Sequence, residues 1–203
     1  AKAIGAEEKK MQDAFMRLKY AQVPTIAAVS GMALGGGCEL ILHCSRAVAS
    51  LESYIGLVEV GVGLIPGAGG LKEGALRAAQ AAQAAGMTDV FPFMKNWFLN
   101  AAMANVSKSA LEAKAMGYLR PTDLVVFNNH ELLWTAVGEA FAMHATGYRP
   151  PLRPKAFPVA GRTGVATIKA QLVNMRDGGF ISQHDFFIAS GIADVMCGGD
   201  VEA

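Results

Sequence analysis

The stretch Ala33–Leu40, "ALGGGCEL", places three consecutive glycines directly before a cysteine and a glutamate. Glycine adopts positive φ readily and lets a ligand approach the main chain closely. If a helix begins within the glycines, its first amides have no internal partner and stabilise a nearby anion. Close packing of a helix on a strand would also need small residues here, so the glycines alone leave both interpretations open.

Two isolated carboxylates lie beside glycine-rich segments. Glu39 is the only formally charged residue between Lys19 and Arg46, and Glu59 is the only one between Glu52 and Lys72. A carboxylate in apolar surroundings is costly unless it is paired or functional, and desolvation suits it to proton transfer. Such a pair predicts general acid/base chemistry next to an oxyanion-binding amide. The alternative for each glutamate is a solvated loop or helix end.

Working outward, apolar runs and periodic segments alternate along the chain. The predicted strands are Thr25–Ser30, Arg46–Ser50 and Asp123–Phe127. The predicted helices are Ala6–Tyr20, Cys38–Ser45, Leu71–Ala85, Phe93–Ala104, Ser109–Gly117, His130–Thr146, Val165–Met175 and Gln183–Met196, the last capped by Ser182. Gly61–Gly70, "GVGLIPGAGG", is predicted as a glycine-rich loop. Glycine-bounded strands alternating with helices predict an α/β or α+β class.

Composition excludes several classes of function. The chain has 203 residues with 52% hydrophobic residues and a net charge of +1, which suits one domain with a large core and gives no basic stripe for nucleic acid. No apolar run reaches the ~18 residues of a membrane-spanning helix. Three cysteines without metal-like spacing and scattered histidines predict reduced thiols, a cytoplasmic location and no metal site. Pro66 replaces the third glycine of a dinucleotide fingerprint, and there is no Gly-x-Ser-x-Gly elbow.

Residues 23–70 resemble the central segment of the enoyl-CoA hydratase/isomerase (crotonase) family. The matching residues are "VPTIAAVSGMALGGGCELILHCSRAVAS" followed by "YIGLVEVGVGLIPGAGG". The resemblance implies a partial α/β fold of the crotonase-like (ClpP/crotonase) type with a helical C-terminal region. Residues 1–120 would form the C-terminal half of the crotonase core, and residues 121–203 a mostly helical extension packed on it.

The resemblance also implies the chemistry. Family members bind an acyl-CoA thioester, whose oxygen would accept a hydrogen bond from Gly36, while Glu39 and Glu59 would act as acid and base. Gly35, Val58 and Gly67 would contact the substrate. Both glutamates favour an enoyl-CoA hydratase of fatty-acid β-oxidation. The alternatives are a Δ3,Δ2-enoyl-CoA isomerase, which needs only the carboxylate at the Glu59 position, and a catalytically silent assembly module.

"LKEGALRA" at residues 71–78 and the tail from Gly147 onward are similar to bacterial proteins that fuse a 3-hydroxyacyl-CoA dehydrogenase to an enoyl-CoA hydratase. This implies a chain truncated at both ends, with the dehydrogenase and its NAD site upstream and no cofactor in this segment. The family implies a homo-oligomer. Its other oxyanion amide comes from upstream strands, so residues 1–203 alone are expected to be nearly inactive. Val58 replaces the proline that many members have before the second glutamate.

Overall fold

The polypeptide alternates between two structural units. A computed structural model describes residues 2–202. The first unit holds the chain up to Leu57 together with Gly67–Gly70 and Val106–Pro154; the second holds Val58–Pro66, Leu71–Asn105 and the chain from Lys155 onward. The predicted division at residue 120 into a core and an extension stays a prediction.

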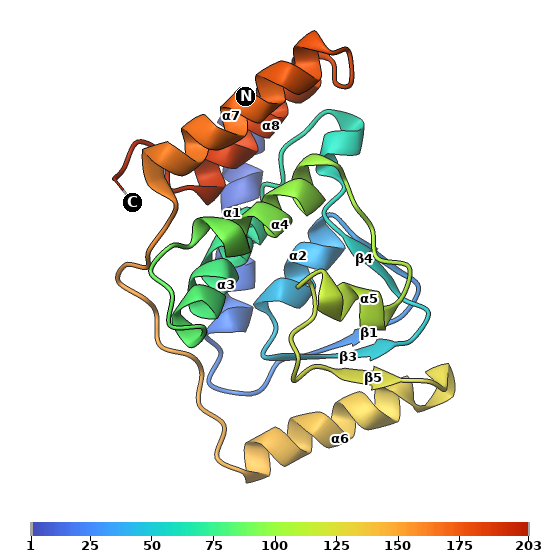
Figure 1. The fold of residues 1–203 in the computed structure, drawn as a ribbon. Coiled ribbons are helices and arrows are strands. Elements are labelled where there is room, and N and C mark those ends of the chain that lie inside the picture. Colours follow the sequence, from blue (N-terminus) through green and yellow to red (C-terminus); the bar gives the residue numbers. More distant parts are fainter. Residues whose placement is uncertain (1, 203) are drawn as a thin grey trace. The chain divides into compact units, whose positions relative to one another are not determined.

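Short parallel strands form two sheets in the first unit (Figure 1). One sheet has the order β1 (Ile26–Val29), β3 (Arg46–Ser50), β5 (Leu124–Val126), and the other pairs β2 (Met32–Leu34) with β4 (Tyr54–Gly56). The helices are α1 (Lys2–Lys19), α2 (Gly36–His43), α5 (Ala110–Ala115) and α6 (Leu132–Ala145), with a 3₁₀ turn η2 (Asn129–Glu131) before α6. The strands predicted from the three apolar runs are therefore confirmed.

Strand β3 lies in the middle of the larger sheet and carries the core of the first unit. Ala47, Val48 and Ala49 are each 0% exposed, as expected for a parallel strand covered on both faces. Helix α6 packs against β1 and β3 (Figure 1). Val48 forms a buried cluster there with Val126, Leu132 and Ala136.

Helix α6 is apolar on two sides. Leu133, Val137 and Phe141 recur at helical spacing on one side, but these residues are 55–70% exposed. The side that packs on the sheet carries Leu132 and Ala136, each one position earlier in the sequence than Leu133 and Val137. Periodicity located the helix, but it could not decide which of two apolar faces the sheet would cover.

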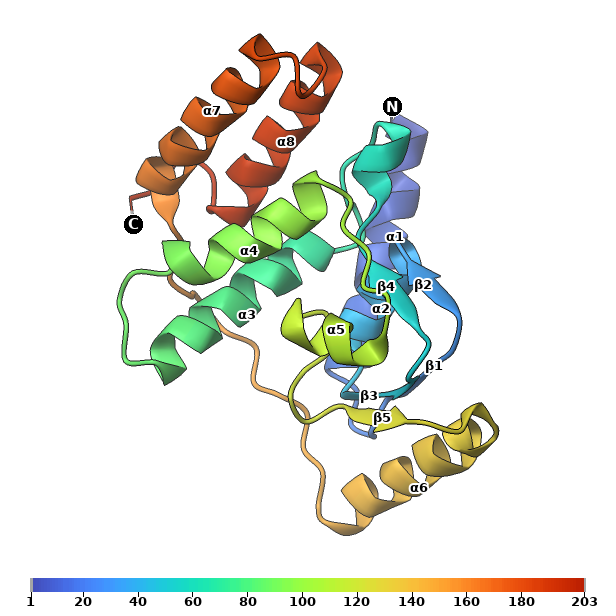
Figure 2. The ribbon, with the colours of Figure 1, turned by 45° about the vertical axis from the view of Figure 1, so that its right-hand side comes forward.

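The second unit is helical. It contains η1 (Glu59–Val62), α4 (Phe91–Ala102), α7 (Gly161–Asp177), α8 (Gln183–Met196) and all of α3 (Gly70–Ala84) except its first residue. Helices α7 and α8 lie side by side as a hairpin (Figure 2). Ser182 and Asp185 form a capping box at the start of α8, which confirms the predicted cap and bounds of this helix.

Several local expectations have clear outcomes. The sequence did not predict β2 and β4, because each has only three residues. The three cysteines are buried, and burial raises the pKa of the Cys197 thiol to about 11. No helix between residues 2 and 202 has the length and apolar character needed to cross a membrane.

Two helix glycines give a matched test of the packing. A Cβ at Gly74 of α3 would lie 2.7 Å from the Trp97 ring, whereas a Cβ at Gly138 of α6 would meet no atom within 4 Å. Alanine favours a helix over glycine by about 1 kcal/mol. We expect Gly138→Ala to raise the free energy of unfolding by up to about 1 kcal/mol and Gly74→Ala to lower it by about 1–3 kcal/mol.

Denaturant unfolding of the two purified variants and the wild type measures both effects. Gly138→Ala is the control, because it makes the same change at a helix position where no ring such as that of Trp97 lies against the glycine. A Gly74→Ala variant as stable as Gly138→Ala would show that Trp97 does not crowd this position.

Candidate active site

The glycine run turns a strand into a helix within one residue. Gly35 caps α2 at φ 54° and ψ −123°, a conformation that favours glycine. Its amide donates to the carbonyl of Gly56 at 2.9 Å, and its carbonyl accepts the amide of Glu39 at 2.9 Å, which is the first hydrogen bond of the helix. Gly35 therefore ties the end of β2 to β4 and starts α2 within the glycines, two residues before the predicted start at Cys38.

Gly36 is the first residue of α2 and is exposed. The first amides of a helix lack a carbonyl one turn earlier, so the helix itself leaves the Gly36 N–H without an acceptor. A Cβ placed on Gly36 would meet no atom within 4 Å. The main chain at this helix start is therefore open on the side where a side chain would lie.

Glu39 lies one turn into α2 and is only 2% exposed. Its Oε1 accepts a hydrogen bond from the Gly70 amide at 2.8 Å, and its Oε2 accepts one from the Ala68 amide at 3.2 Å. These two bonds satisfy the buried charge and join α2 to the second glycine-rich loop. Gly67, predicted to contact the substrate, belongs to that loop, and its carbonyl accepts from the Gln12 side chain at 2.6 Å.

The loop from Gly67 to Gly70 has room for Glu39 only because it carries glycines. A Cβ at Gly70 would lie 2.9 Å from Cγ and 3.0 Å from Oε1 of Glu39, and 3.0 Å from Leu57. Gly69 has a φ of 109°, and a Cβ there would come within 3.2 Å of the His43 ring. His43 is 1% exposed and its Nδ1 lies 2.7 Å from the carbonyl oxygen of Glu39, so it is a core residue.

Glu59 is the first residue of η1 in the second unit, with Val58 at the cap position before it. It is half-buried, and its Oε2 is a buried oxygen without a hydrogen-bond partner among residues 2–202. Burial raises the pKa of this carboxyl, and hydrogen bonds from the amides of Glu59 and Val58 offset part of the rise. A carboxyl with a raised pKa and a free acceptor oxygen is suited to exchanging a proton.

The predicted residues thus fall into two groups. The first unit brings Gly35, Gly36 and Glu39 together on one helix start and joins them to the loop of Gly67. Val58 and Glu59 are neighbours in the second unit, and the pairing of Glu59 with Glu39 stays a prediction. The sequence analysis did not predict the amides of Ala68 and Gly70 as partners of Glu39. The available signal was the glycine-rich loop that contains both residues.

Known proteins resemble this chain in fold and in sequence. Solved structures with related folds include an enoyl-CoA hydratase from Bacillus anthracis, which is 21% identical with a TM-score of 0.55 and is matched over 97% of this chain and 62% of its own. At this identity the likeness shows the fold, which is crotonase-like, mixed α/β and partial, with a helical C-terminal region, as predicted.

Residues 3–90 match the family model of enoyl-CoA hydratase/isomerase. A "Probable 3-hydroxyacyl-CoA dehydrogenase" of Bacillus subtilis is 42% identical over 193 residues, which are 95% of this chain and 24% of the relative. A "Fatty acid oxidation complex subunit alpha" of Colwellia psychrerythraea is 50% identical over 68 residues, which are 34% of this chain and 9% of the relative. The chain spans about a quarter of the first relative's length and less of the second's.

The contact between Glu39 and Gly70 can be tested through stability. In Gly70→Ala the added methyl group would press on the Glu39 carboxylate and on Leu57, so we expect the free energy of unfolding to fall by about 2–3 kcal/mol. Gly61→Ala is the matched control, because a Cβ at Gly61 meets no atom within 4 Å. Denaturant unfolding measures both variants, and an unchanged midpoint for Gly70→Ala would contradict the tight fit.

The raised pKa of Glu59 predicts a pH-dependent gain in stability for Glu59→Gln. The carboxyl of Glu59 ionises in the unfolded chain at its ordinary pKa of 4.5, but in the folded protein only at a higher pH. Between these two pKa values ionisation favours the unfolded chain, so the stability of the wild type falls as pH rises. The variant should therefore match the wild type near pH 4 and be more stable than the wild type at pH 8, by a gain that partial exposure of Glu59 reduces.

Melting temperatures across this pH range measure the difference. Glu52→Gln, at an exposed carboxylate, controls for the change in net charge. A gain for Glu59→Gln that is equally large at pH 4 and pH 8 would rule out ionisation of Glu59 as its cause.

Proposed function

We propose that this chain is the hydratase part of an enzyme that adds water to a trans-2-enoyl-CoA and gives the 3-hydroxyacyl-CoA. The observation that carries the proposal is the start of α2, where an exposed Gly36 amide precedes by one turn a buried carboxylate held in place by two loop amides. The matched family and the relative named for fatty acid oxidation support the same class of reaction.

In the proposed reaction the thioester oxygen accepts a hydrogen bond from the Gly36 N–H. This bond stabilises the enolate-like charge that develops as water attacks C3, an effect of about 3–4 kcal/mol per donor in oxyanion holes. Glu39 and Glu59 hold the water between them. One carboxylate takes a proton from the water as its oxygen bonds to C3, and the other delivers a proton to C2.

Glu39 can hold a water although both of its oxygens already accept a backbone amide. An ionised carboxylate offers about four lone-pair directions, so two amide bonds leave acceptor capacity on each oxygen. The amides fix the orientation of the group, which is what a positioned base needs. Gly35, Val58 and Gly67 are proposed to contact the substrate around these groups.

A second candidate is a Δ3,Δ2-enoyl-CoA isomerase, which moves one proton and needs one carboxylate. The observation that favours it is that Glu59 has an oxygen without a partner among the described residues and a raised pKa, whereas Glu39 is engaged by two amides. In this candidate Glu39 holds the loop and Glu59 alone does the chemistry.

We also propose that the chain is part of a longer protein that carries a 3-hydroxyacyl-CoA dehydrogenase. The Bacillus subtilis relative supports this arrangement, because it is named as a 3-hydroxyacyl-CoA dehydrogenase and is about four times as long as this chain. The product of hydration would be the substrate of the dehydrogenase, and NAD would bind there rather than in residues 1–203. Assembly of the protein as a homo-oligomer belongs to the same proposal.

Matched carboxylate variants distinguish the two reactions. In the full-length protein, we expect Glu39→Gln and Glu59→Gln each to lower kcat for hydration of trans-2-butenoyl-CoA by at least about 100-fold, since each removes a positioned acid or base. Loss of the conjugated enoyl thioester absorbance measures hydration, and a 3-enoyl-CoA substrate measures isomerisation. The exposed Glu52→Gln variant is the control.

Each outcome has a distinct meaning. If Glu39→Gln hydrates at a near wild-type rate, the mechanism with two carboxylates is wrong. If only isomerisation is observed and it depends on Glu59 alone, the isomerase is the correct assignment. A wild-type protein without either turnover would identify a silent assembly module.

A further inference from the structure

Helix α2 carries two groups of the proposed reaction near its first residue, and it is short. Its eight residues, Gly36–His43, extend about 12 Å at 1.5 Å per residue. A tilt that displaces one end of such a short helix also changes where the groups at its other end point. The contacts that hold the carbonyl end of α2 therefore affect the positions of Gly36 and Glu39.

The carbonyl end of α2 is held by the side chain of Arg120, from the segment between α5 and β5. Nη2 of Arg120 donates to the carbonyl of Leu42 at 3.2 Å, and Nη1 donates to the carbonyl of Cys44, the residue that caps the helix, at 3.1 Å. The last carbonyls of a helix lack partners within the helix and attract a cation. One planar guanidinium therefore bonds two carbonyls at the end of α2 at once.

Asp123 holds Arg120 in place and ties it to the sheet. The Asp123 side chain is 1% exposed. Its Oδ1 accepts from the Ala47 amide of β3 at 2.9 Å, and its Oδ2 accepts from the Arg120 amide at 2.5 Å. Oδ1 also lies 3.9 Å from Nη1 of Arg120, so the buried negative charge is compensated. The two side chains thus join the end of α2, the start of β3 and the chain before β5, all within the first unit.

Two anchors define the direction of a helix, whereas one anchor leaves it free to pivot. The first anchor holds the start of α2, where Gly35 bonds to Gly56 and the Glu39 carboxylate accepts the two loop amides. The second anchor is Arg120 at the opposite end. Because both carbonyls that Arg120 bonds belong to the backbone, its side chain acts directly on the course of the helix.

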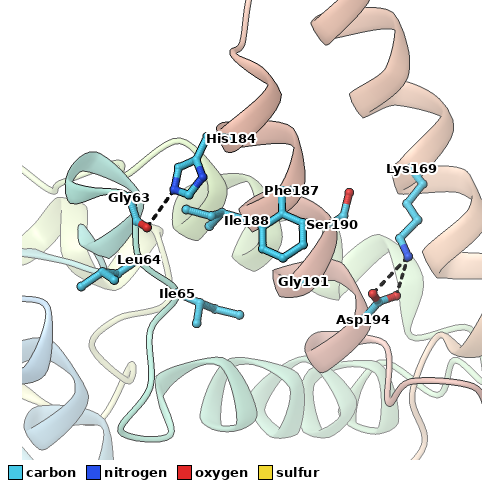
Figure 3. Close-up of a pocket in the computed structure, with 10 residues that line it drawn as sticks. All are labelled: Gly63, Leu64, Ile65, Lys169, His184, Phe187, Ile188, Ser190, Gly191 and Asp194. Carbon is cyan, nitrogen blue, oxygen red and sulfur yellow. Dashed lines mark hydrogen bonds and ion pairs between the residues drawn. The ribbon is translucent and has the colours of Figure 1, made fainter. Parts of the chain in front are cut away.

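The turn that carries Glu59 has a similar but weaker contact. In the second unit, Nε2 of His184 lies 3.1 Å from the carbonyl oxygen of Gly63, the residue that ends η1 (Figure 3). His184 is exposed, so water competes for both partners of this contact. Arg120 forms the stronger contact, because a charged donor makes two bonds and both acceptors belong to buried residues.

We propose that Arg120 is a positioning residue for the hydration reaction. By bonding the carbonyl end of α2, it fixes the direction of the helix and with it the Gly36 amide and the Glu39 carboxylate. This inference rests on the proposed function, because it takes these two groups to act on the thioester and on the water. A misplacement of about 1 Å in a catalytic arrangement can lower the rate about 100-fold.

The first experiment removes the guanidinium in the full-length protein. We expect Arg120→Ala to lower kcat for hydration of trans-2-butenoyl-CoA at least about tenfold and to change KM less than about threefold, since the loss falls on groups that act in the transition state. Arg120→Lys keeps the charge but not the planar fork, so it should melt near the wild type and still lose kcat at least about threefold.

Ser45→Ala is the matched control in the same turn. It removes the contacts of the Ser45 hydroxyl with Thr25 and Tyr148, at 3.0 and 2.8 Å, without removing a donor to the α2 carbonyls. We expect this variant to lose stability and to keep the wild-type kcat. The comparison separates a loosened turn from a displaced helix.

Chemical rescue provides a second test of positioning. The Arg120 side chain is 30% exposed, so Arg120→Ala opens a gap that free guanidinium can enter from solvent. We expect guanidinium at about 50 mM, far below the molar range that unfolds proteins, to raise kcat of Arg120→Ala at least about threefold and to leave the wild type and Ser45→Ala unchanged. Potassium chloride at the same concentration controls for ionic strength and should rescue nothing.

Hydrogen exchange provides a readout that does not depend on turnover. We expect the amides of Gly36–His43 to exchange at least about tenfold faster in Arg120→Ala, and more slowly again with guanidinium, while α6 keeps its protection. This pattern in a wild type and variant without any turnover would refute the proposed function and keep Arg120 as the anchor of α2. Unchanged exchange in α2, a near wild-type kcat for Arg120→Ala or Arg120→Lys, an equal loss of kcat in Ser45→Ala, or no rescue by guanidinium would overturn the inference.

Discussion

The Glu39 carboxylate and the two loop amides that it accepts are the interaction on which the rest of the first unit's site depends. A carboxylate that is 2% exposed needs compensation for lost hydration, and the amides of Ala68 and Gly70 provide it at 3.2 and 2.8 Å. Because both donors belong to the backbone, no side-chain substitution in the loop removes them. The carboxylate therefore fixes the distance between the start of α2 and the loop.

That fixed distance explains why glycines gather at both ends of the contact. Gly35 takes the conformation that starts α2, and a Cβ placed on Gly36 would meet no atom within 4 Å. In the loop, Gly70 leaves room for the Glu39 side chain, and Gly69 lies so close to the His43 ring that a Cβ would crowd it. The motifs "ALGGGCEL" and "IPGAGG" are thus the two halves of one arrangement, although 26 residues separate Leu40 from Gly67.

The sequence predicted the local elements well, and contacts between distant residues poorly. The bounds of β3 and α8 and the cap at Ser182 follow from local signals, since apolar runs and capping side chains act within a few residues. The strands β2 and β4 were missed because three residues carry almost no periodicity. Isolation in apolar sequence indicated that Glu39 is buried, but its two amide donors lie about thirty residues away.

The most direct measurement of the central claim is amide hydrogen exchange in the loop from Gly67 to Gly70. In the wild-type protein the amides of Ala68 and Gly70 donate to Glu39 and should exchange slowly. In Glu39→Gln one side-chain oxygen acceptor remains and the other is replaced by an NH₂ donor, so at least one of the two amides loses its acceptor. We predict that exchange at that amide accelerates at least tenfold while strand β3 keeps its protection. Unchanged exchange at these amides in the variant would contradict the account.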